Sequence, residues 1–191
     1  ARPRVLIPVF PGNNCEWGVA RAFARAGGDP ELLVFTNQTP QNLTESLHHL
    51  ARAIGEAQIV AIPGGFSAGD EPDGSAKFIT AVFRHPEVRE ATLGLLHQRD
   101  GLMLGICNGF QALIKLGLIT HGTIVDQEED MPTLGHNQSG HYISTLVDTR
   151  NCPSHSPWLS HCAPGAIHRL PVAHGEGRLV ASPEWLERLF T

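Results

Sequence analysis

The sequence has no run of lysine and arginine residues, and its formal net charge is -5. A nucleic-acid partner favours the opposite pattern, so we expect no nucleic-acid binding. No apolar segment reaches membrane-spanning length, and residues 1–4 lead into a strand-like run and not into a signal-peptide core. We therefore expect a cytoplasmic protein that does not contact membranes.

Cysteine is also scarce, and the four residues are widely separated: Cys15, Cys107, Cys152 and Cys162. They are too few for a small secreted disulfide scaffold, so we expect thiols. Two of them have histidines nearby, at 155 and 161, but the spacing matches no zinc module. We expect no metal site here. The acidic loop residues Asp70, Glu71 and Asp73 are better explained as a solvated or partner-facing loop.

The composition is that of an ordinary globular protein, with 41% hydrophobic and 17% charged residues in 191 positions. This length suits one domain with a sizeable core, and we expect a single domain over residues 1–191.

Strand-like runs alternate with helical patterns through the first two thirds of the chain. The runs lie at 4–10, 31–35, 58–62 and 102–106, and the helical patterns lie at 15–26, 43–54, 78–83, 87–98 and after Cys107 as far as Gly117. This alternation predicts an α/β fold, with an open, mostly parallel sheet and helices on both faces. Short β-like pieces follow at 121–125, 142–147, 166–172 and 178–181, and predict a small mixed or antiparallel extension in the C-terminal third. Ser182-Pro183-Glu184 opens a last helix.

Residues 105–111, Gly-Ile-Cys-Asn-Gly-Phe-Gln, have the pattern of a nucleophile elbow. A strand that enters a tight turn and then a helix lifts the middle side chain out of the sheet, and flanking glycines allow other segments to approach. The start of the following helix would favour the thiolate form of Cys107. Taken alone, a cysteine at a strand end is equally well explained as a small core residue.

A histidine and a carboxylate follow at the end of a later strand. On an extended strand, residues two apart point to the same side, so Glu176 could orient the His174 imidazole. If this pair reaches Cys107, the three side chains form a nucleophile, a base and an orienting group. The N–H groups of Gly65 and Asn108 would then supply an oxyanion hole, although paired glycines after a strand can simply make a turn.

Three ordered motifs give the chain a resemblance to class I, triad-type glutamine amidotransferase domains. They are residues 63–70 (Pro-Gly-Gly-Phe-Ser-Ala-Gly-Asp), 105–111 and 174–178 (His-Gly-Glu-Gly-Arg). Residues 10–16 (Phe-Pro-Gly-Asn-Asn-Cys-Glu) further resemble the first loop of the glutaminase component of phosphoribosylformylglycinamidine synthases. The resemblance therefore runs from the first strand to the last helix.

This resemblance implies a flavodoxin-like sheet and the hydrolysis of L-glutamine to glutamate and ammonia for purine biosynthesis. It assigns catalysis to Cys107, His174 and Glu176, and the oxyanion hole to Gly65 and Asn108. Glutamine binding is assigned to Gln111, Ser139, Gly140 and His141.

The resemblance also implies a synthetase partner that receives the ammonia. The sequence has no Gly-x-x-x-x-Gly-Lys loop, so we expect no cofactor in this chain, with ATP and magnesium bound by a synthetase domain or subunit. Because the chain begins without methionine and ends just after the last helix, we expect it to be the C-terminal domain of a longer synthetase, with a free subunit as the open alternative.

Other functions stay open at this point. The chain could be a glutaminase for a different synthetase, or a cysteine hydrolase or peptidase of similar fold. Outside enzymes, it could be a noncatalytic structural or regulatory domain.

Overall fold

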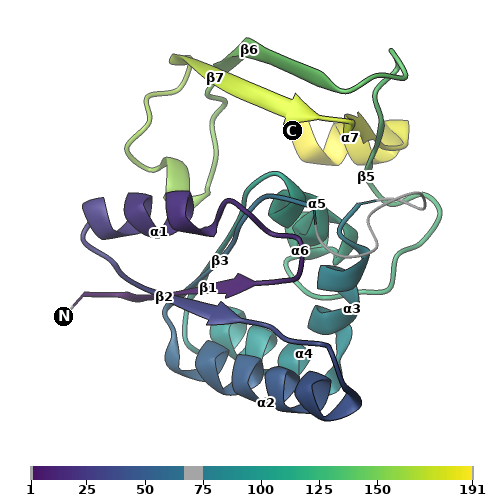
Figure 1. Cartoon of the computed structure of the whole chain (residues 1–191). Helices are drawn as coiled ribbons and strands as arrows, with labels where there is room; N and C mark the ends of the chain where they lie inside the picture. Colours follow the sequence, from purple (N-terminus) through teal and green to yellow (C-terminus); the bar gives the residue numbers. More distant parts are fainter. Residues whose placement is uncertain (1, 67–74, 191) are drawn as a thin grey trace. The chain divides into compact units, whose positions relative to one another are not determined.

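The computed structural model describes residues 2–66 and 75–190 (Figure 1). The chain divides into two compact units, Ala1–Leu134 with Leu179–Thr191, and Gly135–Arg178. A division into two units is compatible with one domain or two, so a single domain over residues 1–191 stays a prediction. The acidic loop residues Asp70, Glu71 and Asp73 lie outside the described residues.

The first unit contains a four-stranded parallel sheet in the order β2-β1-β3-β4. Its strands are β1 (Arg4–Val9), β2 (Asp29–Val34), β3 (Ile59–Ile62) and β4 (Leu102–Gly105). Because neighbouring strands run the same way, their carboxyl ends meet at one edge of the sheet, where α/β proteins place their sites. The segments after β1, β3 and β4 begin at this edge.

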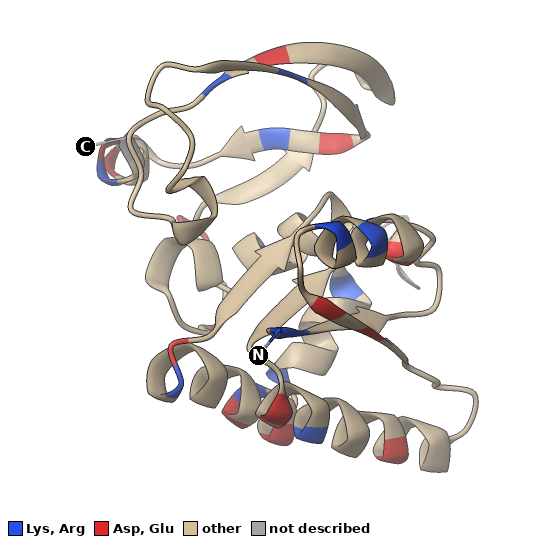
Figure 2. Ribbon diagram, turned by 90° about the vertical axis from the view of Figure 1, so that its left-hand side faces the viewer, with Lys and Arg blue, Asp and Glu red and all other residues tan. Residues whose placement is uncertain are grey.

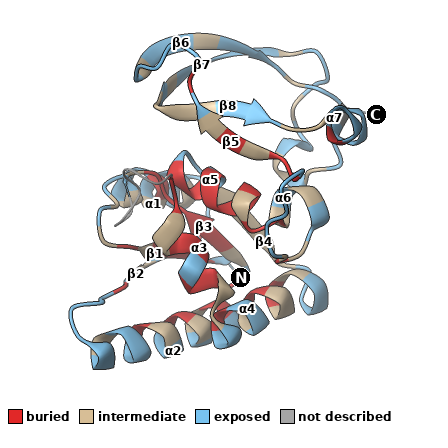
Figure 3. Cartoon of the chain, turned by 90° about the vertical axis from the view of Figure 1, so that its right-hand side faces the viewer, coloured by how far each residue is buried: buried red, intermediate tan, exposed pale blue. Residues whose placement is uncertain are grey.

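Helices cover both faces of this sheet, as predicted. The helices of the first unit, as far as the structure describes it, are α1 (Glu16–Arg25), α2 (Pro40–Glu56), α3 (Lys77–Arg84), α4 (Pro86–Leu93), the π-helical turn η1 (Gly94–Gln98), α5 (Asn108–Lys115), α6 (Leu118–His121) and α7 (Pro183–Phe190). On one face Val5 and Ile7 pack against Val19 of α1. On the other, Leu6 belongs to a larger core with Leu50 of α2 and with α3, α4 and α5 (Figure 3). Residues of β1 are therefore buried on both faces, which explains its nearly continuous apolar sequence.

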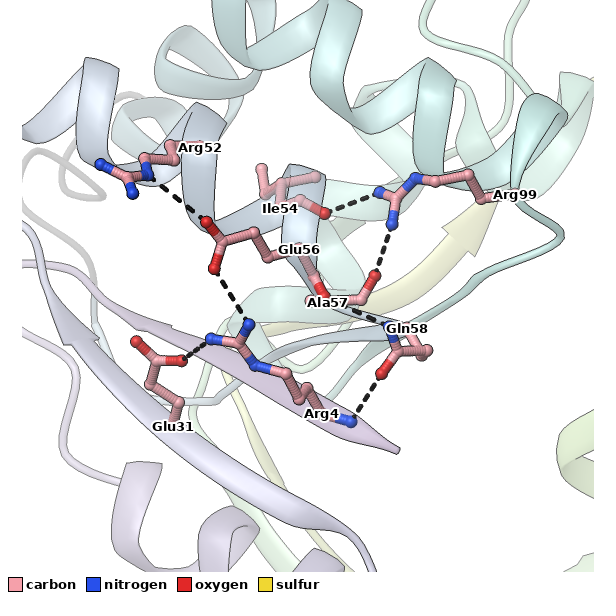
Figure 4. A network of polar contacts seen from close by, with 8 residues as sticks. All are labelled: Arg4, Glu31, Arg52, Ile54, Glu56, Ala57, Gln58 and Arg99. Atoms are coloured by element: carbon pink, nitrogen blue, oxygen red, sulfur yellow. Dashed lines mark hydrogen bonds and ion pairs between the residues drawn. The ribbon is translucent and has the colours of Figure 1, made fainter. Parts of the chain in front are cut away.

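Polar groups hold α2 and the amino ends of the strands. The Thr39 hydroxyl caps α2 by accepting a hydrogen bond from the Asn42 N–H at 3.1 Å. At the other end, the Arg99 guanidinium donates to two carbonyl oxygens, those of Ile54 at 2.7 Å and Ala57 at 2.8 Å (Figure 4).

Arg4 joins the starts of the strands in the same network. Its guanidinium donates to the carboxylates of Glu56 at 2.9 Å and Glu31 at 3.0 Å, while its N–H donates to Gln58 (Figure 4). Acidic and basic residues are interspersed along α2 (Figure 2). This end of the sheet is thus occupied by structural ion pairs, and the segments that follow β1, β3 and β4 begin at the opposite end.

The second unit contains an antiparallel ribbon of β6 (Ile143–Arg150) and β7 (Ile167–His174), with a short 3-10 turn, η2 (Pro157–Leu159), between them. The strands β5 (Thr133–His136) and β8 (Glu176–Val180) form another two-stranded sheet, and they carry the chain from one unit to the other and back. The predicted β extension in the C-terminal third is confirmed.

Some local predictions were wrong or incomplete. Residues 121–125 do not form a strand, because α6 ends in Gly122 with a left-handed φ of 67° and the chain then continues as a loop. Ile124 of this loop is buried in the larger core, so its β-branched side chain serves packing and not pairing. The helix predicted over 87–98 changes from α4 to the π turn η1. The strand β5 and the helix α6 were not predicted.

Candidate active site

Cys107 lies between β4 and α5 with a φ of 54° and a ψ of -110°. A residue with a Cβ rarely adopts such angles, which cost on the order of 1–3 kcal/mol. The predicted elbow of strand, turn and helix is confirmed. The Cys107 side chain is exposed, so the explanation as a small core residue is wrong.

The glycines on either side of Cys107 allow close packing of the turn. A Cβ on Gly105 would lie 2.5 Å from the Gly109 carbonyl oxygen, and one on Gly109 would overlap the carbonyl of Ile62 in β3. Any larger residue would therefore push α5 away from the sheet and alter the turn. The glycines predicted to allow this approach are required for it.

The loops that follow β1 and β3 form one wall beside the elbow. A Cβ on Gly64 would lie 3.1 Å from the Cβ of Cys107. Gly65 has a φ of 122° and forms a bridge with Asn13, whose Cα would be 2.9 Å from an added Cβ. Glycine is required at 65 both by its backbone angle and by the neighbouring loop. The role of Gly65 as an oxyanion donor stays a prediction.

The first turn of α5 holds two further predicted residues in buried positions. Asn108 and Gln111 are 2% and 7% exposed, and the Asn108 side-chain amide donates to Gln111 Oε1 at 3.2 Å. Asn108 begins α5, so its backbone N–H belongs to the first turn of the helix. These contacts fix both residues beside Cys107.

Cys15 is a neighbour of the elbow that the sequence did not reveal as one. A Cβ built on Gly64 would lie 3.7 Å from the Sγ of Cys15 and 3.1 Å from the Cβ of Cys107, so both cysteines lie beside the same glycine. Desolvation, followed by the charges of Cys107 and Glu16, raises the pKa of the Cys15 thiol. Cys15 therefore loses its thiol proton less readily than an ordinary cysteine does, and it lies next to the exposed Cys107. No disulfide joins any of the four cysteines, all of which lie in the described ranges.

His174 is the last residue of β7 in the second unit. Its Nδ1 lies 3.0 Å from Oδ1 of Asn137, which is 8% exposed. A Cβ on Gly177 would overlap the imidazole at Nδ1 and Cε1, so the ring lies directly against this glycine. Sequence reasoning did not predict this contact between Asn137 and His174, since a separation of 37 residues gives no local signal.

Glu176 begins β8, and a bend at Gly175 separates it from β7. The prediction that His174 and Glu176 lie on one extended strand was therefore wrong. The Glu176 side chain is 12% exposed, and its Oε1 lies 3.7 Å from Nε2 of His136. Its role in orienting His174 stays a prediction.

The predicted glutamine-binding loop is a tight turn beside His174. Asn137 accepts a backbone hydrogen bond from the Gly140 N–H at 3.0 Å, and Gly140 has a left-handed φ of 68°. The Ser139 hydroxyl oxygen lies 3.3 Å from both the N–H and the carbonyl oxygen of His141. Residues 139, 140 and 141 are all exposed. Contact of Ser139, Gly140 and His141 with glutamine stays a prediction.

The structure thus groups the predicted residues in two sets. Cys107, Gly65, Asn108 and Gln111 gather at the carboxyl edge of the parallel sheet, while the second unit contains the remaining set, His174, Glu176, Ser139, Gly140 and His141. Meeting of the two sets stays a prediction. Among the residues that the structure describes, no group of three or more His, Cys, Asp or Glu side chains could hold a metal ion.

Comparison with known proteins shows the family to which this chain belongs. Residues 2–191 match the family model of the CobB/CobQ-like glutamine amidotransferase domain. The chain therefore belongs to the glutamine amidotransferase family, and the resemblance seen in the three motifs is confirmed.

Its relatives are more specific. The chain is 33% identical over 184 residues to the phosphoribosylformylglycinamidine synthase subunit PurQ of Acaryochloris marina, covering 96% of this chain and 65% of that protein. It is 33% identical over 191 residues to PurQ of Dehalococcoides mccartyi, covering 99% and 68%. The chain thus spans about two thirds of the length of these relatives.

A solved structure shares the fold. The structure of PurLQS from Thermotoga maritima matches with a TM-score of 0.69 and 25% identity, over 96% of this chain and 72% of that one. In residues 2–66 and 75–190, no helix has the length and apolar character needed to cross a membrane.

Proposed function

We propose that this chain hydrolyses L-glutamine to glutamate and ammonia, and that a phosphoribosylformylglycinamidine synthase uses the ammonia in purine biosynthesis. The observation that carries this proposal is the elbow at Cys107, an exposed sulfur on a strained turn with glycine-lined walls. Family membership and the PurQ relatives support it.

In the first step, His174 accepts the proton of the Cys107 thiol as the sulfur attacks the side-chain carbonyl carbon of glutamine, and the carbonyl oxygen becomes an oxyanion. The N–H groups of Gly65 and Asn108 stabilise this charge, each contributing about 3 kcal/mol. His174 gives a proton to the departing nitrogen, the C–N bond breaks, and ammonia leaves a γ-glutamyl thioester on the sulfur.

In the second step, His174 accepts a proton from water as the water oxygen attacks the thioester. The C–S bond breaks, glutamate leaves, and the Cys107 thiolate is restored. Glu176 stabilises the positive imidazolium, while Gln111 and the turn that contains Ser139, Gly140 and His141 bind glutamine. The synthetase partner binds ATP and magnesium, and both proteins act in the cytoplasm.

The test is the release of glutamate from glutamine, compared between the unmodified chain, Cys107→Ala and the matched control Cys152→Ala. Cys152 is an exposed cysteine outside the elbow, so its removal should leave the rate unchanged. A diazoketone analogue of glutamine should label Cys107 and no other cysteine. Full glutaminase activity in Cys107→Ala would refute the mechanism.

The identity of the ammonia acceptor needs a separate assay. Addition of a purified phosphoribosylformylglycinamidine synthase subunit should allow glutamine to replace free ammonia in amidation of formylglycinamide ribonucleotide. Coupling to another synthetase, and not to this one, would retain the glutaminase and reject the acceptor. Activity on peptides but not on glutamine would favour a cysteine peptidase.

A further inference from the structure

Asn137 is buried and makes several hydrogen bonds, although the turn to which it belongs is otherwise exposed. Its backbone N–H donates to the Gly175 carbonyl at 2.9 Å, and its side chain is 8% exposed. Its side-chain Nδ2 donates to two backbone carbonyls, those of His174 at 2.9 Å and His141 at 3.0 Å. The amide is thus anchored to both segments that flank the His174 ring.

These contacts determine which way the amide points. A carbonyl oxygen only accepts hydrogen bonds, so the atom that faces two carbonyls must be the NH2 group. The other atom of the amide, which lies 3.0 Å from Nδ1 of His174, is therefore the oxygen. This oxygen also only accepts, so Nδ1 must carry the proton.

The consequence concerns the other nitrogen of the ring. In a neutral imidazole one nitrogen is protonated and the other has an available lone pair, and the hydrogen bond at one nitrogen sets the state of the other. With its proton on Nδ1, His174 has its lone pair on Nε2. A base that takes a proton from a thiol or from water needs this lone pair.

We infer that Asn137 is a positioning residue that holds the His174 imidazole in the tautomer with Nδ1 protonated, so that Nε2 is the basic atom. This inference rests on the proposed role of His174 in glutamine hydrolysis. Gly177 completes the arrangement, because the ring lies against it and a side chain there would displace it.

Two substitutions of Asn137 distinguish the hydrogen bond that its side-chain oxygen accepts from His174 from the two that its NH2 group donates to carbonyls. Asn137→Ala and Asn137→Asp both remove the NH2 group and its two bonds to carbonyls. Asp alone keeps an oxygen that can accept from Nδ1. A purely structural role predicts that both variants behave alike, whereas a role in setting the tautomer predicts that they differ.

Asn151→Ala is the matched control. The Asn151 side chain also donates to two carbonyls of the second unit, those of Cys162 at 2.9 Å and Ala163 at 3.1 Å. Its substitution removes the same kind of anchoring from a turn between β6 and β7. Asn151→Ala should leave both kcat and the tautomer of the His174 imidazole unchanged.

The direct measurement is the 15N chemical shift of the two His174 ring nitrogens in the full chain. The signals are assigned by their loss in His174→Gln, and the spectra are recorded at a pH at which the imidazole is neutral. We expect protonated Nδ1 in the unmodified chain and in Asn137→Asp, and a mixture of tautomers in Asn137→Ala. A protonated Nε2 in the unmodified chain would overturn the inference. So would a tautomer in Asn137→Ala identical to that of the unmodified chain.

Kinetics give the second readout. Asn137→Ala should lower kcat by about 10²-fold with little change in KM, the size of a general-base contribution. Asn137→Asp should recover most of kcat and move the acidic limb of the pH profile to higher pH, since a carboxylate favours the imidazolium. Equal losses in both variants would overturn the inference. If no form hydrolyses glutamine, the proposed function fails, and the ring-nitrogen shifts alone decide the role of Asn137.

Discussion

Substitution of Gly177 by alanine should disable His174 without removing any functional group. The Cβ of such an alanine would lie 2.6 Å from Cγ of His174 and would overlap Nδ1 and Cε1. Carbon atoms in contact prefer a separation of about 3.5–4.0 Å, so the ring must move by about 1 Å. Its hydrogen bond to Asn137, now 3.0 Å long, would then be stretched or lost.

A displacement of this size in a reacting group costs about 10²-fold in rate. We therefore expect Gly177→Ala to lower the kcat of glutamine hydrolysis by about 10²-fold. The assay is steady-state release of glutamate, with the thermal midpoint of unfolding recorded for the same samples.

Gly175→Ala is the control, because it adds the same methyl group two residues away. The nearest atom to its Cβ is Cδ2 of Tyr142 at 3.9 Å, an ordinary contact, so the rate should be unchanged. Equal rates for Gly177→Ala and the unmodified chain would refute the argument that the ring depends on this glycine. Equal losses in both alanine variants would refute it as well.

Three further predictions concern the first unit. Arg99→Ala leaves two carbonyls at the end of α2 without their guanidinium donor, so the free energy of unfolding in urea should fall by about 2 kcal/mol. An unchanged urea midpoint would show that water replaces the guanidinium at no cost. Hydrogen bonds from Arg4, and then from Arg52, hold the pKa of the Glu56 carboxyl below its usual range. The unfolded chain therefore binds this proton first, and the stabilisation is lost as the pH falls below about 4.3. Glu56→Gln should flatten the acidic fall in stability, and a curve as steep as before would contradict this. Cys107→Ser removes a charge that raises the pKa of Cys15, so alkylation of Cys15, followed by mass spectrometry, should shift to lower pH; an unshifted profile would contradict the coupling.

The parallel sheet could be predicted because its information is local. β1 is apolar along nearly its whole length since it is buried on both faces, and the glycines around Cys107 mark a turn that only they can make. Strand, helix and elbow each depend on residues close in sequence. Residues 121–125 show the limit, since the same β-branched pattern that suggests a strand also suits a loop packed into a core.

The environment of His174 could not be predicted in the same way. The sequence placed His174 and Glu176 on one strand because alternate residues share a face, yet Gly175 bends the chain between β7 and β8. Nothing in residues 174–178 indicates that Asn137 would occupy Nδ1. That contact depends on the turn at 137–141, which the chain brings back only when it folds.

The sequence by itself determined the chemical types available to this protein: a cysteine on a glycine-flanked turn, a histidine with a nearby carboxylate, and a sheet that collects its loops at one edge. It determined them because strand burial and tight turns impose their residue types locally. Only the tertiary structure decided which atoms meet. It placed Cys15 beside Cys107 and the Asn137 oxygen at the His174 ring, because hydrogen bonds and contacts between distant segments follow from packing and leave no periodic trace in the chain.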